Sequence, residues 1–159
     1  MFIKTQALSD KMKSVRLALT LCIILTLGFI FTQSMLPSEI AGKESDAVSG
    51  ILSSLLPPGS ALSDLVENNM DKIAHFTEFS ALGFFVSLYI CFFAIAPIKT
   101  GALSLLFAET VAIFDETIQI FSGRNPDIND VWCDLLGFFT LSVITYLAFF
   151  TLKWLLKKE

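Results

Sequence analysis

Long apolar runs alternate with short polar segments along the chain. Four runs of about 20 mostly apolar residues lie at 17–36, 79–98, 100–121 and 131–152. The first two carry no charge, the third contains Glu109, Asp115 and Glu116, and the fourth contains Asp134. A helix that crosses the hydrocarbon layer needs about 20 such residues. The pattern predicts an all-α integral membrane protein with four transmembrane helices, at about 16–36, 73–97, 100–121 and 129–153.

Composition supports a membrane protein. The 159 residues suit one domain, which we expect to extend over 1–159, and 54% of them are hydrophobic while only 16% are charged. Soluble domains are roughly 45–50% apolar and about 25% charged. These values, with a net charge of −4, exclude a disordered chain, a disulfide-dense secreted scaffold and a basic nucleic-acid binder. Cys22, Cys91 and Cys133 all fall in predicted helices and are expected to act as small hydrophobes.

Basic residues predict the orientation of the spans. Eight of them flank one side of the predicted membrane and three flank the other, and the richer side is normally cytoplasmic. We therefore expect a multi-pass cell-membrane protein with both termini in the cytoplasm and extracytoplasmic loops at 37–72 and 122–128. A cleaved signal peptide is the alternative for the first run, but that run is long for one and no small-x-small cleavage site follows it.

The first outer loop contains two amphipathic patterns. In Ala47–Leu56 the apolar residues recur at helical spacing, and Pro57-Pro58-Gly59 then interrupts the pattern. Ser60 is placed to cap a second short helix that aligns Leu62, Leu65 and Val66. The loop is expected to form two short amphipathic helices on the outer membrane surface. Alternatively, the loop folds over the helix bundle and buries the same apolar face.

Polar side chains form stripes on three of the predicted helices. At about 100° per residue, one stripe of the third helix lies within roughly 120° and consists of Glu109, Ala112, Asp115, Glu116 and Gln119. The stripes of the second and fourth helices consist of Asp71, His75 and Glu78 and of Asp127, Asp130 and Asp134. Because successive helices alternate in direction, the stripes meet near the outer ends. Glu109 alone lies about 15 Å deeper, near mid-membrane.

The stripes carry more acids than bases. Six carboxylates are opposed only by Arg124, His75 and Lys72, and buried like charges cannot all stay ionised. Some acids must therefore be protonated, bind a cation or contact a ligand. A divalent cation coordinated by carboxylates and Gln119 is the candidate cofactor, and zinc is less favoured because one histidine and no cysteine pair are available. The chain has no GxSxG, HExxH, Walker or Rossmann motif.

Several of these polar residues also have a simpler interpretation. Asp127, after Pro126, suits a helix N-cap, and Asp130 suits the positive end of the same helix. Arg124 is able to pair with a surface acid, and His75 to make one ordinary interfacial hydrogen bond. Gln33 and Ser34 are equally suited to a plain helix end.

The polar segments resemble motifs of VanZ-like proteins. The matching segments are Asp71–Phe76 with Phe79 and Leu82-Gly83, Asp115–Phe121, Gly123–Asp127, Asp130-Val131 with Gly137, and Phe31–Ser34. Asp134 departs from the pattern, where asparagine is more common, and Glu109 is not part of it. The resemblance implies a small membrane protein that lowers sensitivity to glycopeptide or lipoglycopeptide antibiotics such as teicoplanin. It implies no particular reaction, so whether the protein is an enzyme stays open.

The residues suggest three functional hypotheses. In the first, an outward-facing site binds or modifies a lipid-linked cell-wall precursor or another membrane lipid, and the antibiotic is affected indirectly. Its catalytic candidates are His75, Glu78, Asp115 and Glu116, with Glu78 supporting proton transfer by His75, and its substrate-binding candidates are Arg124, Gln119, Asp130 and Asp134. The second hypothesis is a non-enzymatic scaffold or drug-sequestering binder that depends on the helices in Ala47–Val66. The third is a small proton- or ion-coupled transporter that uses Glu109.

Overall fold

The computed structural model describes residues 2–57 and 59–157, and every regular element in them is a helix. The helices are α1 (Phe2–Ser34), α2 (Ser38–Ser54), α3 (Ala61–Asn68), α4 (Met70–Phe93), α5 (Pro97–Phe121) and α6 (Ile128–Leu156). Pro58 of the predicted loop break lies outside the described residues, as do Met1, Lys158 and Glu159 at the chain ends.

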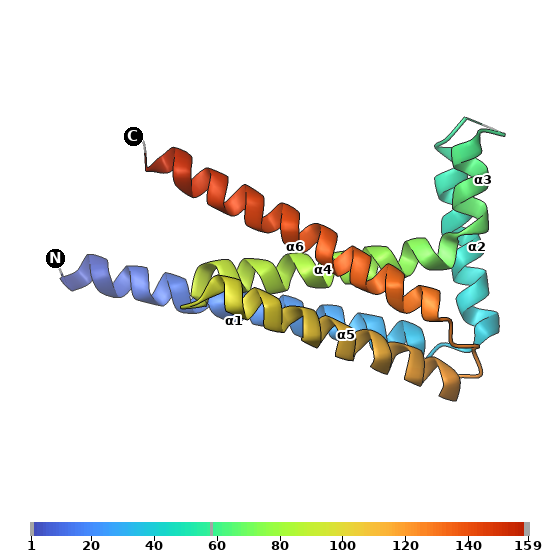
Figure 1. Cartoon of the computed structure of the whole chain (residues 1–159), viewed down its shortest axis with the longest axis horizontal. Coiled ribbons are helices and arrows are strands. Elements are labelled where there is room, and N and C mark those ends of the chain that lie inside the picture. The colour runs from blue at the N-terminus through green and yellow to red at the C-terminus, as the bar shows by residue number, and fades with distance from the viewer. Residues whose placement is uncertain (1, 58, 158–159) are drawn as a thin grey trace.

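The four long helices form an elongated bundle. Figure 1 shows α1, α4, α5 and α6 running along the long axis, with α2 and α3 across one end and both termini at the other end. Helix α4 is central because it packs against α1, α5 and α6. The arrangement places the segment 122–127 and the short helices at the same end of the bundle.

Three helices are long and apolar enough to cross a membrane, at Ser9–Ser34, Met70–Phe93 and Ile128–Leu156. Helix α5 is not among them, and it carries Glu109, Asp115 and Glu116. The prediction of an all-helical membrane protein is therefore confirmed for three spans, while the fourth remains a prediction.

The predicted boundaries of the long helices differ from the observed ones by up to three residues at most ends and by more at two places. Helix α1 begins at Phe2 instead of near residue 16, because its polar first part continues the helix and includes a Lys13–Asp10 ion pair at 3.1 Å. Helix α4 ends at Phe93 instead of residue 97, where Pro97 opens α5. Proline suits a first helical turn, and it disfavours helical backbone in the residue before it.

Two glycines bring α4 and α6 into backbone contact. A Cβ atom added at Gly83 would lie 2.3 Å from the backbone oxygen of Phe138, and one added at Gly137 would lie 2.2 Å from the backbone oxygen of Phe76. Small residues allow this close approach of membrane helices. The register of α4 against α6 is consequently fixed near the polar end of the bundle.

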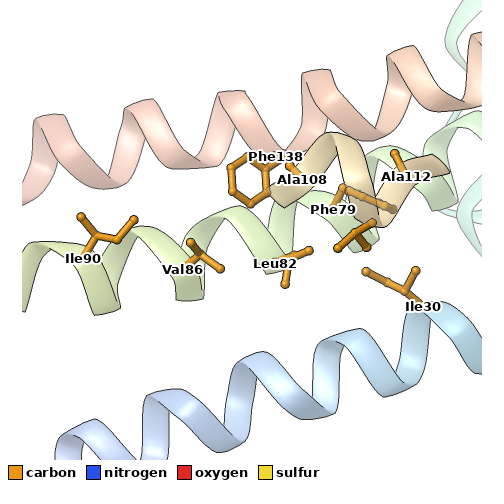
Figure 2. Packing of buried hydrophobic residues seen from close by; sticks show 9 residues of the cluster. Ile30, Phe79, Leu82, Val86, Ile90, Ala108, Ala112 and Phe138 are labelled. Atoms are coloured by element: carbon orange, nitrogen blue, oxygen red, sulfur yellow. The ribbon is translucent and has the colours of Figure 1, made fainter. Parts of the chain in front are cut away.

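The buried apolar core is narrow. Figure 2 shows side chains from all four long helices meeting along α4. The core consists of Ile30, Phe79, Leu82, Val86, Ile90, Ala108, Val111, Ala112 and Phe138. Many other large apolar side chains point outward, including Leu25 and Leu147, which are 71% and 64% exposed. Such a surface suits a bundle that is solvated by lipid.

Helix α2 is longer than the amphipathic segment expected from the sequence, since it begins at Ser38 instead of residue 47. Ser60 caps α3 by accepting a hydrogen bond from Ser63 N at 3.2 Å. Part of the apolar face of α2 and of the turn after it is open, with Ile51 64% and Leu55 76% exposed. Val48 and Leu52 of the same face line a cavity against α1 and α4, so both interpretations of this loop stay predictions.

Candidate functional site

His75, Asp115 and Asp134 meet between α4, α5 and α6. The His75 Nδ1 atom lies 3.0 Å from Asp134 Oδ1 and 3.6 Å from Asp115 Oδ2. All three residues are buried, and Asp134 is fully enclosed. We call these three residues the acid–histidine cluster. Each helix of the central bundle that carries a predicted polar stripe contributes one of its members.

Hydrogen bonds from α1 and α5 hold the acids of α5 in place. Ser34 Oγ, at the end of α1, donates to Asp115 Oδ1. Gln119 Nε2 donates to Asp115 Oδ2 at 3.0 Å and to Glu116 Oε1 at 3.1 Å. The spacings of three and four residues place Gln119 over both acids on one helix face. These donors satisfy carboxyl oxygens of two buried side chains.

The connection from α5 to α6 closes over Glu116. Its Oε2 atom accepts a hydrogen bond from the backbone N–H of Asp127 at 2.8 Å. The Asp127 side chain in turn accepts from Asn129 N at 2.9 Å, which confirms its interpretation as the N-cap of α6. Hydrogen bonds from Asn129 and from Lys72 hold the pKa of Asp127 below its ordinary value.

Lys72 joins α4 to the start of α6. Its Nζ atom lies 3.3 Å from Asp130 Oδ1 and 3.4 Å from Asp127 Oδ2. Asp130 is buried, so this ion pair compensates an acid that the sequence analysis assigned to substrate binding. The other interpretation of Asp130, as an acid at the positive end of a helix, also fits its place in the first turn of α6.

A cavity of about 540 Å³ opens beside the cluster. Its polar lining includes His75, Glu78, Asp115, Gln119 and Arg124, and its apolar walls include side chains of α1 and α2, such as Phe29, Val48 and Leu52. Small-molecule sites commonly occupy about 300–1,000 Å³ and combine apolar walls with a few polar groups. The cavity is thus suited in size and lining to an amphiphilic ligand.

Arg124 and Glu78 lie at the cavity without close charged partners. Arg124 is half-buried, and among the residues described no acid lies within 4 Å of its guanidinium, so its pairing with a surface acid stays a prediction. Glu78 makes no hydrogen bond to His75 in the described part of the chain. The His75 ring contacts Asp134 and Asp115 on neighbouring helices instead, and the support of proton transfer by Glu78 stays a prediction.

Two further acids lie apart from the cluster. Glu109 is exposed on α5, so its predicted place on the protein-facing stripe is wrong. Among the described residues no segment covers the Glu109 side chain, whereas the α5–α6 connection covers Glu116 through the backbone N–H of Asp127. Asp71 is also exposed and accepts a hydrogen bond from Ser45 Oγ of α2 at 3.1 Å. It links α4 to α2 instead of joining His75.

The structure adds residues that sequence analysis did not assign to the site. Ser34 contacts Asp115, and Ser122 Oγ donates to the Ser34 backbone oxygen at 2.7 Å, which ties α1 to the end of α5. Lys72 was counted only as a basic residue near the acids. The sequence signal for Ser34 was its place in the segment Phe31–Ser34, which resembles a motif of VanZ-like proteins.

Two overlapping groups have the composition of a metal site. The ligand atoms of His75, Asp115 and Asp134 lie within 4.8 Å of one another, and so do those of His75, Glu116 and Asp130. Both groups share His75. The second group links the acid–histidine cluster to the covered carboxylate of α5 and to the first turn of α6.

Comparison with known protein families gives a match that covers most of the chain. The family model described as VanZ/LLP1 matches residues 15–150. Comparisons with curated proteins and with solved structures give no match. The matched segment contains α2 to α5 and most of α1 and α6, together with every residue of the site. The chain therefore belongs to the VanZ/LLP1 family.

Proposed function

We propose that this protein lowers sensitivity to glycopeptide or lipoglycopeptide antibiotics, such as teicoplanin, by binding or modifying a lipid-linked cell-envelope molecule. The observation that carries the proposal is the cavity of about 540 Å³ with polar groups at one part of its wall and apolar side chains around the rest. A lipid-linked precursor has the same division into a polar head and an apolar tail. The antibiotics named act on such precursors outside the membrane.

The proposal places α5 across the membrane as a fourth span. Both termini lie at one end of the bundle (Figure 1), and a chain with both ends on one side of a membrane crosses it an even number of times. Helix α5, with 25 residues, is long enough for the crossing. Its acids Asp115 and Glu116 are buried in protein, which reduces the cost of having them in the membrane.

Basic residues support a cytoplasmic location for the termini. Lys11, Lys13 and Arg16 lie in the first half of α1, Lys153 lies in the last turn of α6, and Lys99 lies in the first turn of α5. This end of the bundle is opposite to α2 and α3 (Figure 1), and α2 lines the cavity. By the positive-inside rule the cavity then opens toward the extracytoplasmic face.

In the proposed site Arg124 binds an anionic group of the ligand. A guanidinium binds phosphate or carboxylate through two parallel hydrogen bonds, and Arg124 has no competing ion pair among the described residues. Gln119 keeps the two acids of α5 in position. His75 contacts two carboxylates and lines the cavity, so it is placed to exchange a proton with a bound molecule.

The test combines susceptibility with lipid analysis. Arg124→Ala and Glu116→Gln are each expected to return the inhibitory concentration of teicoplanin to that of cells without the protein, while membrane insertion stays intact. Lys43→Ala is the matched control, because Lys43 is an exposed basic residue outside the cavity lining. Lipid-linked precursors extracted from cells with the wild type and with Glu116→Gln are compared to identify the ligand. Full protection by both site variants would remove the cavity from the explanation.

A non-enzymatic scaffold is the second candidate, and the exposed apolar face of α2 and α3 favours it. That face includes Ile51, Leu55 and Leu65. If Ile51→Ser and Leu55→Ser abolish protection while Glu116→Gln keeps it, the scaffold replaces the cavity as the functional feature. The exposed position of Glu109 gives no support to an internal ion path.

A further inference from the structure

We propose that the acid–histidine cluster binds one divalent transition-metal ion, such as Zn²⁺ or Mn²⁺, through His75, Asp115 and Asp134. In a tetrahedral site with bonds of about 2.0–2.2 Å, neighbouring ligand atoms lie roughly 3.3–3.6 Å apart. The His75 Nδ1 atom lies 3.0 Å from Asp134 Oδ1 and 3.6 Å from Asp115 Oδ2. The distance to Asp115 matches this spacing, the distance to Asp134 is slightly shorter, and the ligand atoms of all three residues lie within 4.8 Å of one another.

An unsatisfied oxygen of Asp134 provides a second and independent observation. Asp134 is fully buried, and its Oδ1 atom contacts His75. Its Oδ2 atom is also buried and has no hydrogen-bond partner among the described residues. A buried carboxylate oxygen without a donor is costly. A metal ion that both oxygens of Asp134 coordinate would remove this cost, because Oδ2 would then have a cation as its partner.

The local charges also favour a cation. Asp115, Asp134 and Glu116 are all buried within the same group of helices. Lys72 is paired with Asp127 and Asp130, at 3.4 Å and 3.3 Å, so it does not compensate these three acids. A divalent ion neutralises two carboxylates at once. With such an ion bound, the negative charge of the cluster needs no further basic side chain to balance it.

The donor set selects among metals. One imidazole with carboxylates suits Zn²⁺ and Mn²⁺, whereas Mg²⁺ and Ca²⁺ prefer all-oxygen sites. The sequence analysis favoured a carboxylate site completed by Gln119, and the structure differs on this point. Gln119 turns its amide nitrogen toward Asp115 and Glu116 and acts as a donor. The imidazole of His75, and not the amide of Gln119, is therefore the candidate ligand that accompanies the carboxylates.

The inference deepens the proposed function and rests on it only for the role of the bound ion. Since His75 and Asp115 also line the cavity, an ion held by them is able to accept a phosphate oxygen of a bound lipid headgroup. Metal binding itself is measured on the purified protein, and antibiotic protection is measured in cells. The failure of one is thus seen separately from the failure of the other.

Metal content is the direct test. The full-length protein is purified in detergent, stripped with a chelator, and dialysed separately against Zn²⁺, Mn²⁺ and Mg²⁺ before elemental analysis. We expect about one equivalent of Zn²⁺ or Mn²⁺ per chain for the wild type, and less than about a tenth for Asp134→Asn and His75→Gln. Glu109→Gln, which removes an exposed acid from α5, is the matched control and is expected to bind as the wild type does.

Thermal unfolding separates loss of the site from loss of the fold. A ligand that binds the native state raises the melting temperature, so a chelator is expected to lower the Tm of the wild type and to leave that of Asp134→Asn unchanged. Gel filtration and helical circular dichroism report whether each variant is folded, and Asp115→Asn serves if Asp134→Asn is not. Three results would overturn the proposal: a wild type that binds neither Zn²⁺ nor Mn²⁺, one that binds only Mg²⁺, or folded cluster variants that bind as the wild type does.

Discussion

Replacing Gly137 with alanine tests whether the close approach of α4 and α6 positions the acid–histidine cluster. The added Cβ atom would lie 2.2 Å from the backbone oxygen of Phe76, whereas ordinary contact begins at 3.4 Å. The obstacle is backbone and not a flexible side chain, so the two helices must separate by about 1.2 Å at this point, as in other cases of overpacking.

The separation of the helices lengthens the hydrogen bond between His75 of α4 and Asp134 of α6. His75 precedes Phe76 in the chain, and Asp134 lies one turn before Gly137. A displacement of that size lengthens the distance of 3.0 Å between His75 Nδ1 and Asp134 Oδ1 to about 4 Å, which is beyond hydrogen-bond range. Overpacking typically costs about 1–3 kcal/mol, so the bundle is expected to remain folded while the cluster is disrupted.

The assay measures teicoplanin inhibitory concentration, metal content and Tm on the same variant. Gly137→Ala is expected to lose protection and bound metal and to unfold at a lower temperature. Gly28→Ala is the matched control, because no atom lies within 4 Å of the Cβ atom that it adds. Alanine in a helix is also favoured over glycine by about 1 kcal/mol, so the Tm of the control stays equal or rises. Wild-type Tm, metal content and protection in Gly137→Ala would refute the reasoning.

Three further predictions concern single side chains. Ser34→Ala removes a donor from buried Asp115 and is expected to lower the free energy of unfolding by about 1–3 kcal/mol, measured by denaturant titration in detergent. Asp127→Asn keeps the cap but removes the charge that Lys72 and Asn129 stabilise. Its Tm deficit against the wild type is expected at neutral pH and should vanish as the pH falls below 3.8 and through the lowered pKa; a deficit independent of pH would contradict this. Glu109→Gln is expected to leave protection unchanged in the susceptibility assay, because Glu109 lies outside the cluster.

Periodicity alone predicted the buried face of α5. Asp115, Glu116 and Gln119 share one side of an ideal helix, and all three are buried. Glu109 lies seven residues before Glu116, at nearly the same angle, yet it is exposed. Angle determines which way a side chain points, but burial also requires a neighbouring segment at that height. A single sequence contains no such information about the neighbouring segments.

The sequence predicted that the polar stripes meet, but not which side chains contact each other between helices. Glu78 was expected to support His75 because the two residues are three positions apart on one helix. The observed partner, Asp134, is 59 positions away and reaches His75 because Gly83 and Gly137 fix the register of α4 against α6. Helix spacing is a local property of the sequence. The approach of two helices depends on which small residues meet, which became visible only in three dimensions.

The placement of the chain ends has a practical consequence for work on this protein. From His75 to the end of α4 the helix rises about 27 Å, and from Asp134 to the end of α6 it rises about 33 Å. Both termini lie at the end of the bundle opposite α2 (Figure 1), and α2 lines the cavity, so an affinity tag or a fluorescent protein at either end is expected to leave ligand entry open. Imaging, pull-down and reconstitution are then expected to be possible with one tagged chain.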